Sequence, residues 1–248
     1  MVQLRDMEPL DLPEGRRTIG AVHARLREMI LSGGIGPGTV LSQVELARML
    51  GVSRTPLREA LRMLQEEGLI EAEPNRRARV TGFSPQDLDS LYGARVALET
   101  LGASITMPRL TEHDLDQAEA LLDHMRVVGE QDEFDAWQEA HRAFHRRLVD
   151  HAGDQLLRLI IVQAERSERY LRTYRMNLPG TWWTAGDSSH RAIIAACRDQ
   201  RLDLAKDELA KHVARTALAV LAEIAPEQEP VAVRAALKLV VNPSNVRR

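Results

Sequence analysis

The sequence has few of the features that mark secreted or membrane-spanning proteins. Its 248 residues include one cysteine, Cys197, so no disulfide can form within the chain, as is usual in a reducing compartment. No apolar run approaches the roughly 20 residues that a helix needs to span a bilayer. Residues 1–17 are polar and partly acidic, unlike a signal peptide. These absences favour a cytoplasmic protein with no membrane partner.

The sequence also lacks a charge excess. Its formal net charge is −3, from 33 Lys and Arg against 36 Asp and Glu, and residues 1–82 are almost neutral. Binding to nucleic acid would therefore depend on a local basic surface and on two copies acting together. The length is sufficient for two domains.

The segment 41–80 has the pattern of a winged helix-turn-helix. Ser42 and Glu45 form a capping-box pattern, and Gly51 is placed to end the short helix that follows at a positive φ. A second helix with apolar residues three and four apart ends at Gly68. Two short extended runs joined by a turn come next. Two such helices followed by a hairpin predict a DNA-binding module.

Several polar side chains lie where this module would contact DNA. An Arg at the start of the second helix can reach a guanine edge in the major groove, while its neighbours contact phosphates. Cations of the hairpin can hold the backbone or enter a minor groove. Charge runs are usually solvated faces, so the arginines indicate DNA only together with the cap, the turn and the helix. The candidate DNA-binding residues are Ser53, Arg54, Thr55, Arg58, Arg76, Arg77 and Arg79.

The residues VSRTPLREAL at 52–61 and EGLI at 67–70 resemble the signature of the GntR family of bacterial transcription regulators. In that family the arginines that match Arg54 and Arg58 contact operator DNA. The resemblance implies a regulator, usually a repressor. Recognition helices of this size usually act in dimers on palindromic half-sites, so we expect a homodimer on a palindromic operator.

Two positions depart from the family pattern. The family commonly has Arg at the position of Val44, and that Arg often contacts DNA. The tip of the wing often carries Gly where this chain has Arg77, which adds a cation. The operator sequence therefore cannot be transferred from the family.

After residue 82 the pattern becomes helical throughout, so we expect a mostly α protein whose second part is an all-α antiparallel bundle. The expected domains are the winged helix-turn-helix at 1–82, a helical effector-binding domain at 83–225 and a C-terminal tail at 226–248, in which 231–241 has the pattern of a short helix. The expected bundle helices are about 84–107, 111–128, 131–151, 154–176, 184–199 and 202–224.

Four histidines of the helical part form a candidate metal site. His141 and His145 are four residues apart and share one helix face, and His190 and His212 lie on two later helices. Imidazoles from neighbouring helices commonly build metal sites in bundle cores. Four nitrogens favour Zn²⁺, or Ni²⁺ or a similar ion, over Mg²⁺ or Ca²⁺. The alternative is four ordinary polar residues, since an i, i+4 pair also arises by chance.

The helical part resembles the FCD effector domain of FadR-like GntR regulators, over about residues 84–225. In that domain an Asp-x-x-x-His pair and one His on each of two later helices hold a divalent metal. The resemblance implies this role for His145, His190 and His212. His141 stands at the Asp position, which replaces a carboxylate by a neutral imidazole and raises the charge of the site by one.

Arg95 matches an Arg that this subgroup commonly places near the effector. A guanidinium fork pairs with a carboxylate, so a small organic acid is the expected effector. The alternative for Arg95 is a surface ion pair with Glu99. Two alternatives remain for the whole chain: a regulator with a structural metal or none, and a metal-dependent hydrolase with Glu139 or Glu165 as base.

Overall fold

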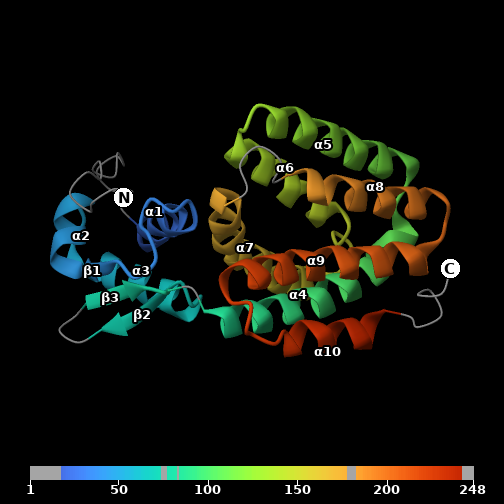
Figure 1. Cartoon of the computed structure of the whole chain (residues 1–248). Coiled ribbons are helices and arrows are strands. Elements are labelled where there is room, and N and C mark those ends of the chain that lie inside the picture. The colour runs from blue at the N-terminus through green and yellow to red at the C-terminus, as the bar shows by residue number, and fades with distance from the viewer. Residues whose placement is uncertain (1–17, 74–76, 83, 178–182, 242–248) are drawn as a thin grey trace. The chain divides into compact units, whose positions relative to one another are not determined.

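The computed structural model describes residues 18–73, 77–82, 84–177 and 183–241 (Figure 1). The chain divides into two compact units, Met1–Ser84 and Pro85–Arg248, and each is described by itself. One unit combines short helices with a small sheet, and the other is helical. The mostly α fold class predicted from the sequence is confirmed.

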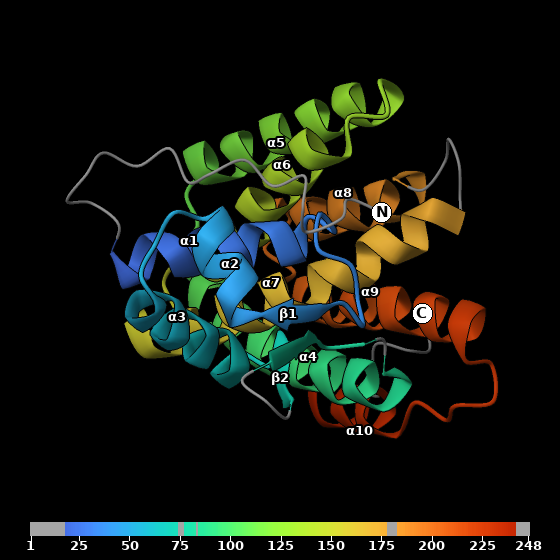
Figure 2. The same ribbon diagram turned by 90° about the vertical axis from the view of Figure 1, so that its left-hand side faces the viewer.

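The first unit contains, in its described part, three helices around an antiparallel sheet of strand order β1-β3-β2. Helices α1 and α2 both pack against α3 (Figure 2). Gly51 and Gly68 have φ angles of 60° and 70° at the ends of α2 and α3, a conformation that favours glycine, as predicted. The elements are α1 (Ile19–Leu31), β1 (Val40–Ser42), α2 (Gln43–Met49), α3 (Arg54–Glu66), β2 (Ile70–Glu73) and β3 (Arg77–Val80).

One apolar core holds this unit together. Leu26 of α1, Leu46 of α2 and Leu57 and Leu64 of α3 are fully buried in it. The Ser42 hydroxyl accepts a hydrogen bond from the Glu45 amide at the start of α2, at 3.5 Å. The core side of α3 is therefore occupied, and its opposite side is left for solvent or a partner.

The second unit is a bundle in which α4 packs against α7, α9 and α10, while α5 packs against α6 and α8. Figure 1 shows α9 between α8 and α4, in agreement with the packing of α9 on both helices. No described helix is long and apolar enough to cross a membrane. The elements are α4 (Pro85–Thr106), the 3-10 helix η2 (Met107–Arg109), α5 (Glu112–Glu130), α6 (Phe134–Arg147), α7 (Asp154–Asn177), α8 (Thr184–Arg198), α9 (Leu202–Ile224) and α10 (Val231–Val240).

Helix α6 is shorter than the expected helix over 131–151. It starts at Phe134 because Asp132 has a φ of 58°, which breaks the helix before it. It ends at Arg147, after which the chain turns. The histidine pair lies inside the observed helix, so this difference does not affect the predicted site.

Helix α10 lies in the segment expected as a tail, and it docks on α4. The buried Asp89 carboxylate accepts hydrogen bonds from the amides of Ala232, at 2.8 Å, and Val233, at 3.0 Å. Both amides belong to the first turn of α10, where backbone N–H groups have no acceptor within the helix. A Cβ at Gly93 would lie 2.9 Å from Ala232, so the close approach of the helices requires glycine there.

Replacing Gly93 by alanine is expected to destabilise the helical unit by about 1–3 kcal/mol, because α10 must move away from α4. Urea unfolding of the full chain measures this change. Gly20→Ala is the matched control, because no heavy atom lies within 4 Å of a Cβ at this helical position. We expect no loss of stability in the control, and an unchanged midpoint for Gly93→Ala would contradict the docking described.

Candidate functional site

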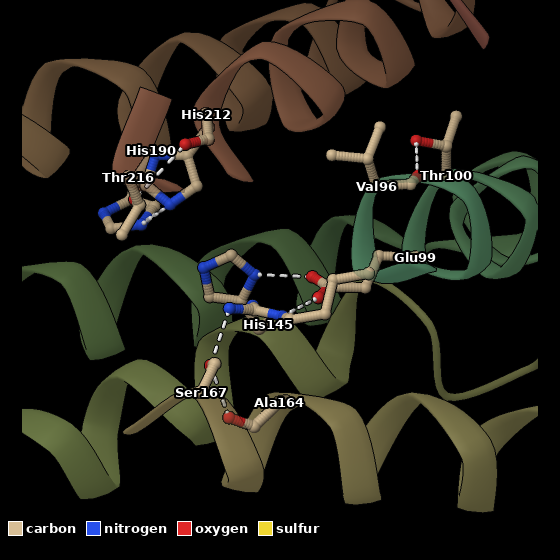
Figure 3. A network of polar contacts seen from close by, with 10 residues as sticks. Val96, Glu99, Thr100, His145, Ala164, Ser167, His190, His212 and Thr216 are labelled. Atoms are coloured by element: carbon tan, nitrogen blue, oxygen red, sulfur yellow. Dashed lines mark hydrogen bonds and ion pairs between the residues drawn. The ribbon is translucent and has the colours of Figure 1, made fainter. Parts of the chain in front are cut away.

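The four histidines that the sequence singles out, a pair at i, i+4 and one on each of two later helices, come together inside the helical unit. His141 and His145 come from α6, His190 from α8 and His212 from α9. One nitrogen of each ring lies within 4.8 Å of those of the other three. Figure 3 shows His145 facing the space next to His190 and His212, which are 0% and 7% exposed. We call this group the histidine cluster.

Contacts between the rings leave nitrogen lone pairs available inside the cluster. His190 Nε2 and His212 Nε2 are 3.0 Å apart. Trp137 stacks on His141, with ring centroids 4.6 Å apart. His145 Nε2 and His190 Nδ1 are buried and have no hydrogen-bond partner among the described residues. Buried nitrogens without partners are costly, by about 1–3 kcal/mol each, and a metal ion would satisfy them. The donor set therefore fits a divalent borderline ion.

Burial also sets the charge of the cluster. Desolvation lowers the pKa values of His141, His190 and His212 well below the ordinary value near 6.5, and neighbouring histidines lower them further. These three rings are therefore neutral around neutral pH. The neutral imidazole is the form that binds a metal ion.

A buried ion pair lies beside the cluster. Arg95 Nε donates to Glu99 Oε1 at 2.7 Å, and Arg95 Nη1 donates to Ser167 Oγ at 2.8 Å. Glu99 Oε2 lies 3.3 Å from His145 Nδ1 (Figure 3). Arg95 and Glu99 are only 5% and 2% exposed, so the alternative of a surface ion pair is wrong: the pair exists but is buried.

Glu99 is a site residue that the sequence analysis missed. Burial alone would raise its pKa, but Arg95 and His145 outweigh burial and lower the pKa to about 2. The carboxylate is therefore charged and can orient the His145 ring through Nδ1, which leaves Nε2 directed at the cluster. The i, i+4 spacing from Arg95 was the available signal, but it did not reveal burial.

Two cavities adjoin the cluster, and both are lined by Arg95, His141 and Leu171. The first, of about 270 Å³, lies between α4, α6 and α7 and has several charged side chains in its wall. The second, of about 340 Å³, is lined by His190 and His212 as well as His141. A small ligand in the second cavity would lie next to three of the four imidazoles.

The first unit carries the candidate DNA-contacting residues on the solvent side of α3 and on the hairpin. Arg79 is half-buried, and its Nη1 donates to the Gly38 carbonyl at 3.1 Å. Arg76 lies outside the described residues. The exposed candidates are Ser53, Arg54, Thr55, Arg58 and Arg77.

Comparison with known families identifies both parts of the chain. The profile described as "Bacterial regulatory proteins, gntR family" matches residues 18–80, and the FCD domain profile matches residues 90–215, about half of the chain. The chain belongs to the GntR family. The family predicted from the sequence is thereby confirmed, as is the FCD domain. The relatives are named as transcriptional regulators, in agreement with the predicted regulator and not with the hydrolase alternative.

Individual relatives of this GntR-family chain agree with that assignment. It is 29% identical over 138 residues to the HTH-type regulator YdhC of Bacillus subtilis, a match that covers 55% of this chain and only 62% of YdhC. It is 27% identical over 210 residues to a probable D-xylose utilization operon transcriptional repressor of Paenarthrobacter nicotinovorans, covering 83% and 91% of the two chains. The structure of Escherichia coli McbR/YncC shares the fold, with a TM-score of 0.72, 20% identity and coverage of 83% and 97%.

The metal-free GntR-family protein is expected to lose stability as the pH falls below about 6.5. His141, His190 and His212 have folded-state pKa values below those of the unfolded chain. Below about pH 6.5 the unfolded state therefore binds more protons than the folded state, which lowers the free energy of unfolding. At higher pH the three histidines are neutral in both states, and this loss of stability is absent. The melting temperature in excess chelator, measured from about pH 8 to about pH 5, tests this dependence.

His190→Leu should make this pH dependence shallower, because one buried imidazole is removed. The exposed His124 on α5 provides the control, and His124→Ala should keep the dependence of the unaltered protein. A melting temperature that stays constant over this pH range would contradict the neutral state of the cluster.

Proposed function

We propose that this GntR-family protein is a homodimeric transcriptional repressor that binds a palindromic operator. A small carboxylate metabolite, bound at a divalent metal ion in the FCD domain, modulates that binding. The observation that carries the proposal is the buried histidine cluster, with its unpartnered nitrogens, in a chain that also has an exposed basic recognition helix.

The DNA-binding part of the proposal rests on α3 and the hairpin. Arg54 and Arg58 are exposed on α3, where they suit contacts with base edges, and Ser53 and Thr55 suit contacts with phosphates. The hairpin would contact the DNA backbone next to α3 through Arg77 and Arg79, and through Arg76, which lies outside the described residues. The unit is almost neutral overall, so two copies on two half-sites would supply the affinity that one lacks.

The metal-binding part assigns the ion to His141, His145, His190 and His212. Zn²⁺ suits four imidazole nitrogens, and Ni²⁺ or a similar ion is the second choice. When bound, the ion supplies a positive charge that attracts a carboxylate oxygen. Neutral histidines do not cancel this charge, and Glu99, the carboxylate beside His145, is already paired with Arg95. The metal site therefore favours an anion.

The effector part assigns Arg95 to the carboxylate, because Arg95 lines both cavities next to His141. An effector changes operator affinity only if it binds one arrangement of the dimer more tightly than the other. The factor by which the effector changes operator affinity is also the factor by which the operator changes effector affinity.

Arg58→Ala is expected to weaken operator binding by about 1–3 kcal/mol, the usual contribution of a specific contact to a base. The measurement is fluorescence anisotropy with a duplex that the unaltered protein selects from a random pool. Arg25→Ala is the control, because Arg25 is an exposed cation of α1 that pairs with Glu28. Equal operator affinity in Arg58→Ala and in the unaltered protein would contradict the assignment of α3 as the reading helix.

His212→Ala is expected to abolish binding of Zn²⁺, because it removes one of the four ligands and the only one from α9. Metal content after purification and dialysis, measured by inductively coupled plasma mass spectrometry, gives the stoichiometry. His113→Ala, at an exposed position of α5, should retain the full metal content. Full metal content in His212→Ala would show that the cluster does not hold the ion.

A further inference from the structure

The second cavity has walls that are mainly apolar. Its polar lining consists of Arg95, His141, Ser189, His190, His212, Arg215 and Thr216. Such a wall suits the apolar body of a ligand, with a few polar groups that orient it. The apolar lining residues are Phe134, Trp137, Leu171, Trp183, Val213 and Ala219.

Besides His190 Nδ1, the Ser189 hydroxyl and Trp183 Nε1 in this cavity have no hydrogen-bond partner among the described residues. Ser189 is 4% exposed, and Trp183 Nε1 is buried as well. Buried donors are normally satisfied, so these two point to acceptor atoms that a ligand supplies. They lie in the same cavity as His190 and His212, where the proposed metal would also take an acceptor.

The first cavity has a different character. Its charged side chains pair with one another: Arg95 with Glu99 at 2.7 Å, and Arg142 with Glu168 at 3.0 Å. Besides the nitrogens of His145, its lining has one buried donor without a hydrogen-bond partner among the described residues, Gln138 Nε2. Apart from Arg95, which lines both cavities, the paired charged groups of the first cavity offer little to a ligand.

We infer that the effector is an aromatic monocarboxylate, about the size of phenylacetate, in the second cavity. This inference rests on the proposed function. The carboxylate accepts from Ser189 and meets the metal, and the ring packs on the indoles and aliphatic side chains of the wall. A sugar acid carries several hydroxyls, and those that face Leu171 and Val213 would find no partner.

Isothermal titration calorimetry on the full-length Zn²⁺-loaded protein tests the class of ligand, with phenylacetate, gluconate and succinate as probes. Phenylacetate is expected to bind at least about tenfold more tightly than the other two, since only its body matches the apolar wall. Tighter binding of gluconate or succinate would overturn the aromatic class and leave the carboxylate sensor intact. Failure of all three to bind the metal-loaded protein would count against the proposed function itself, and the inference would fall with it.

Two variants test the cavity. Ser189→Ala should weaken phenylacetate binding several-fold, and Trp183→Leu should weaken it further because it removes both a donor and an aromatic surface. Metal content should stay unchanged in both variants, which also shows that they fold. Gln138→Leu is the matched control, because it removes the unpaired donor of the first cavity. Loss of phenylacetate binding in Gln138→Leu alone would move the site to the first cavity and overturn the inference.

Discussion

The helical unit is organised around four imidazoles that are taken out of water together. Their nitrogens approach within 4.8 Å, and desolvation holds three of the rings in the neutral form. Protonated rings at such distances would repel one another, and the low polarity of the core would strengthen that repulsion. His141, His190 and His212 are therefore neutral in the folded protein. A metal ion bound in the cluster, as proposed, would satisfy the buried nitrogens that have no partner among the described residues.

Helix α4 connects this cluster to the rest of the unit. Arg95 and Glu99 present a buried ion pair to His145, while Asp89 and Gly93 receive the first turn of α10. The ion pair supplies the carboxylate that orients a ligand imidazole, as is usual around metal sites. Glu99 is already paired with Arg95, and in the proposed metal site His141 stands where the family has an aspartate, so the charge of a bound ion would be uncompensated. That charge and the apolar side chains of the second cavity are the basis of the inferred ligand class.

The DNA-binding unit depends on local features instead. Positive φ angles at Gly51 and Gly68 end α2 and α3, and one apolar core covers the inner side of α3. The exposed arginines then lie on the remaining side. The caps, the helix faces and the hairpin of this module all lie within about forty residues, which explains why its pattern is legible from the sequence.

The sequence by itself determined the features that depend on neighbours along the chain. These include the glycine ends of α2 and α3, the shared helix face of His141 and His145, and the separation of a winged helix-turn-helix from a helical bundle. Periodicity and capping act over a few residues, so the sequence records them directly. Only the tertiary structure decided that α8 and α9 bring their histidines to α6, that the Arg95–Glu99 pair is buried, and that α10 docks on α4. It also placed the unpaired donors in the second cavity. Each of these features depends on packing between segments that are distant in sequence. The spacing of residues within one helix does not specify which other helix will pack against them.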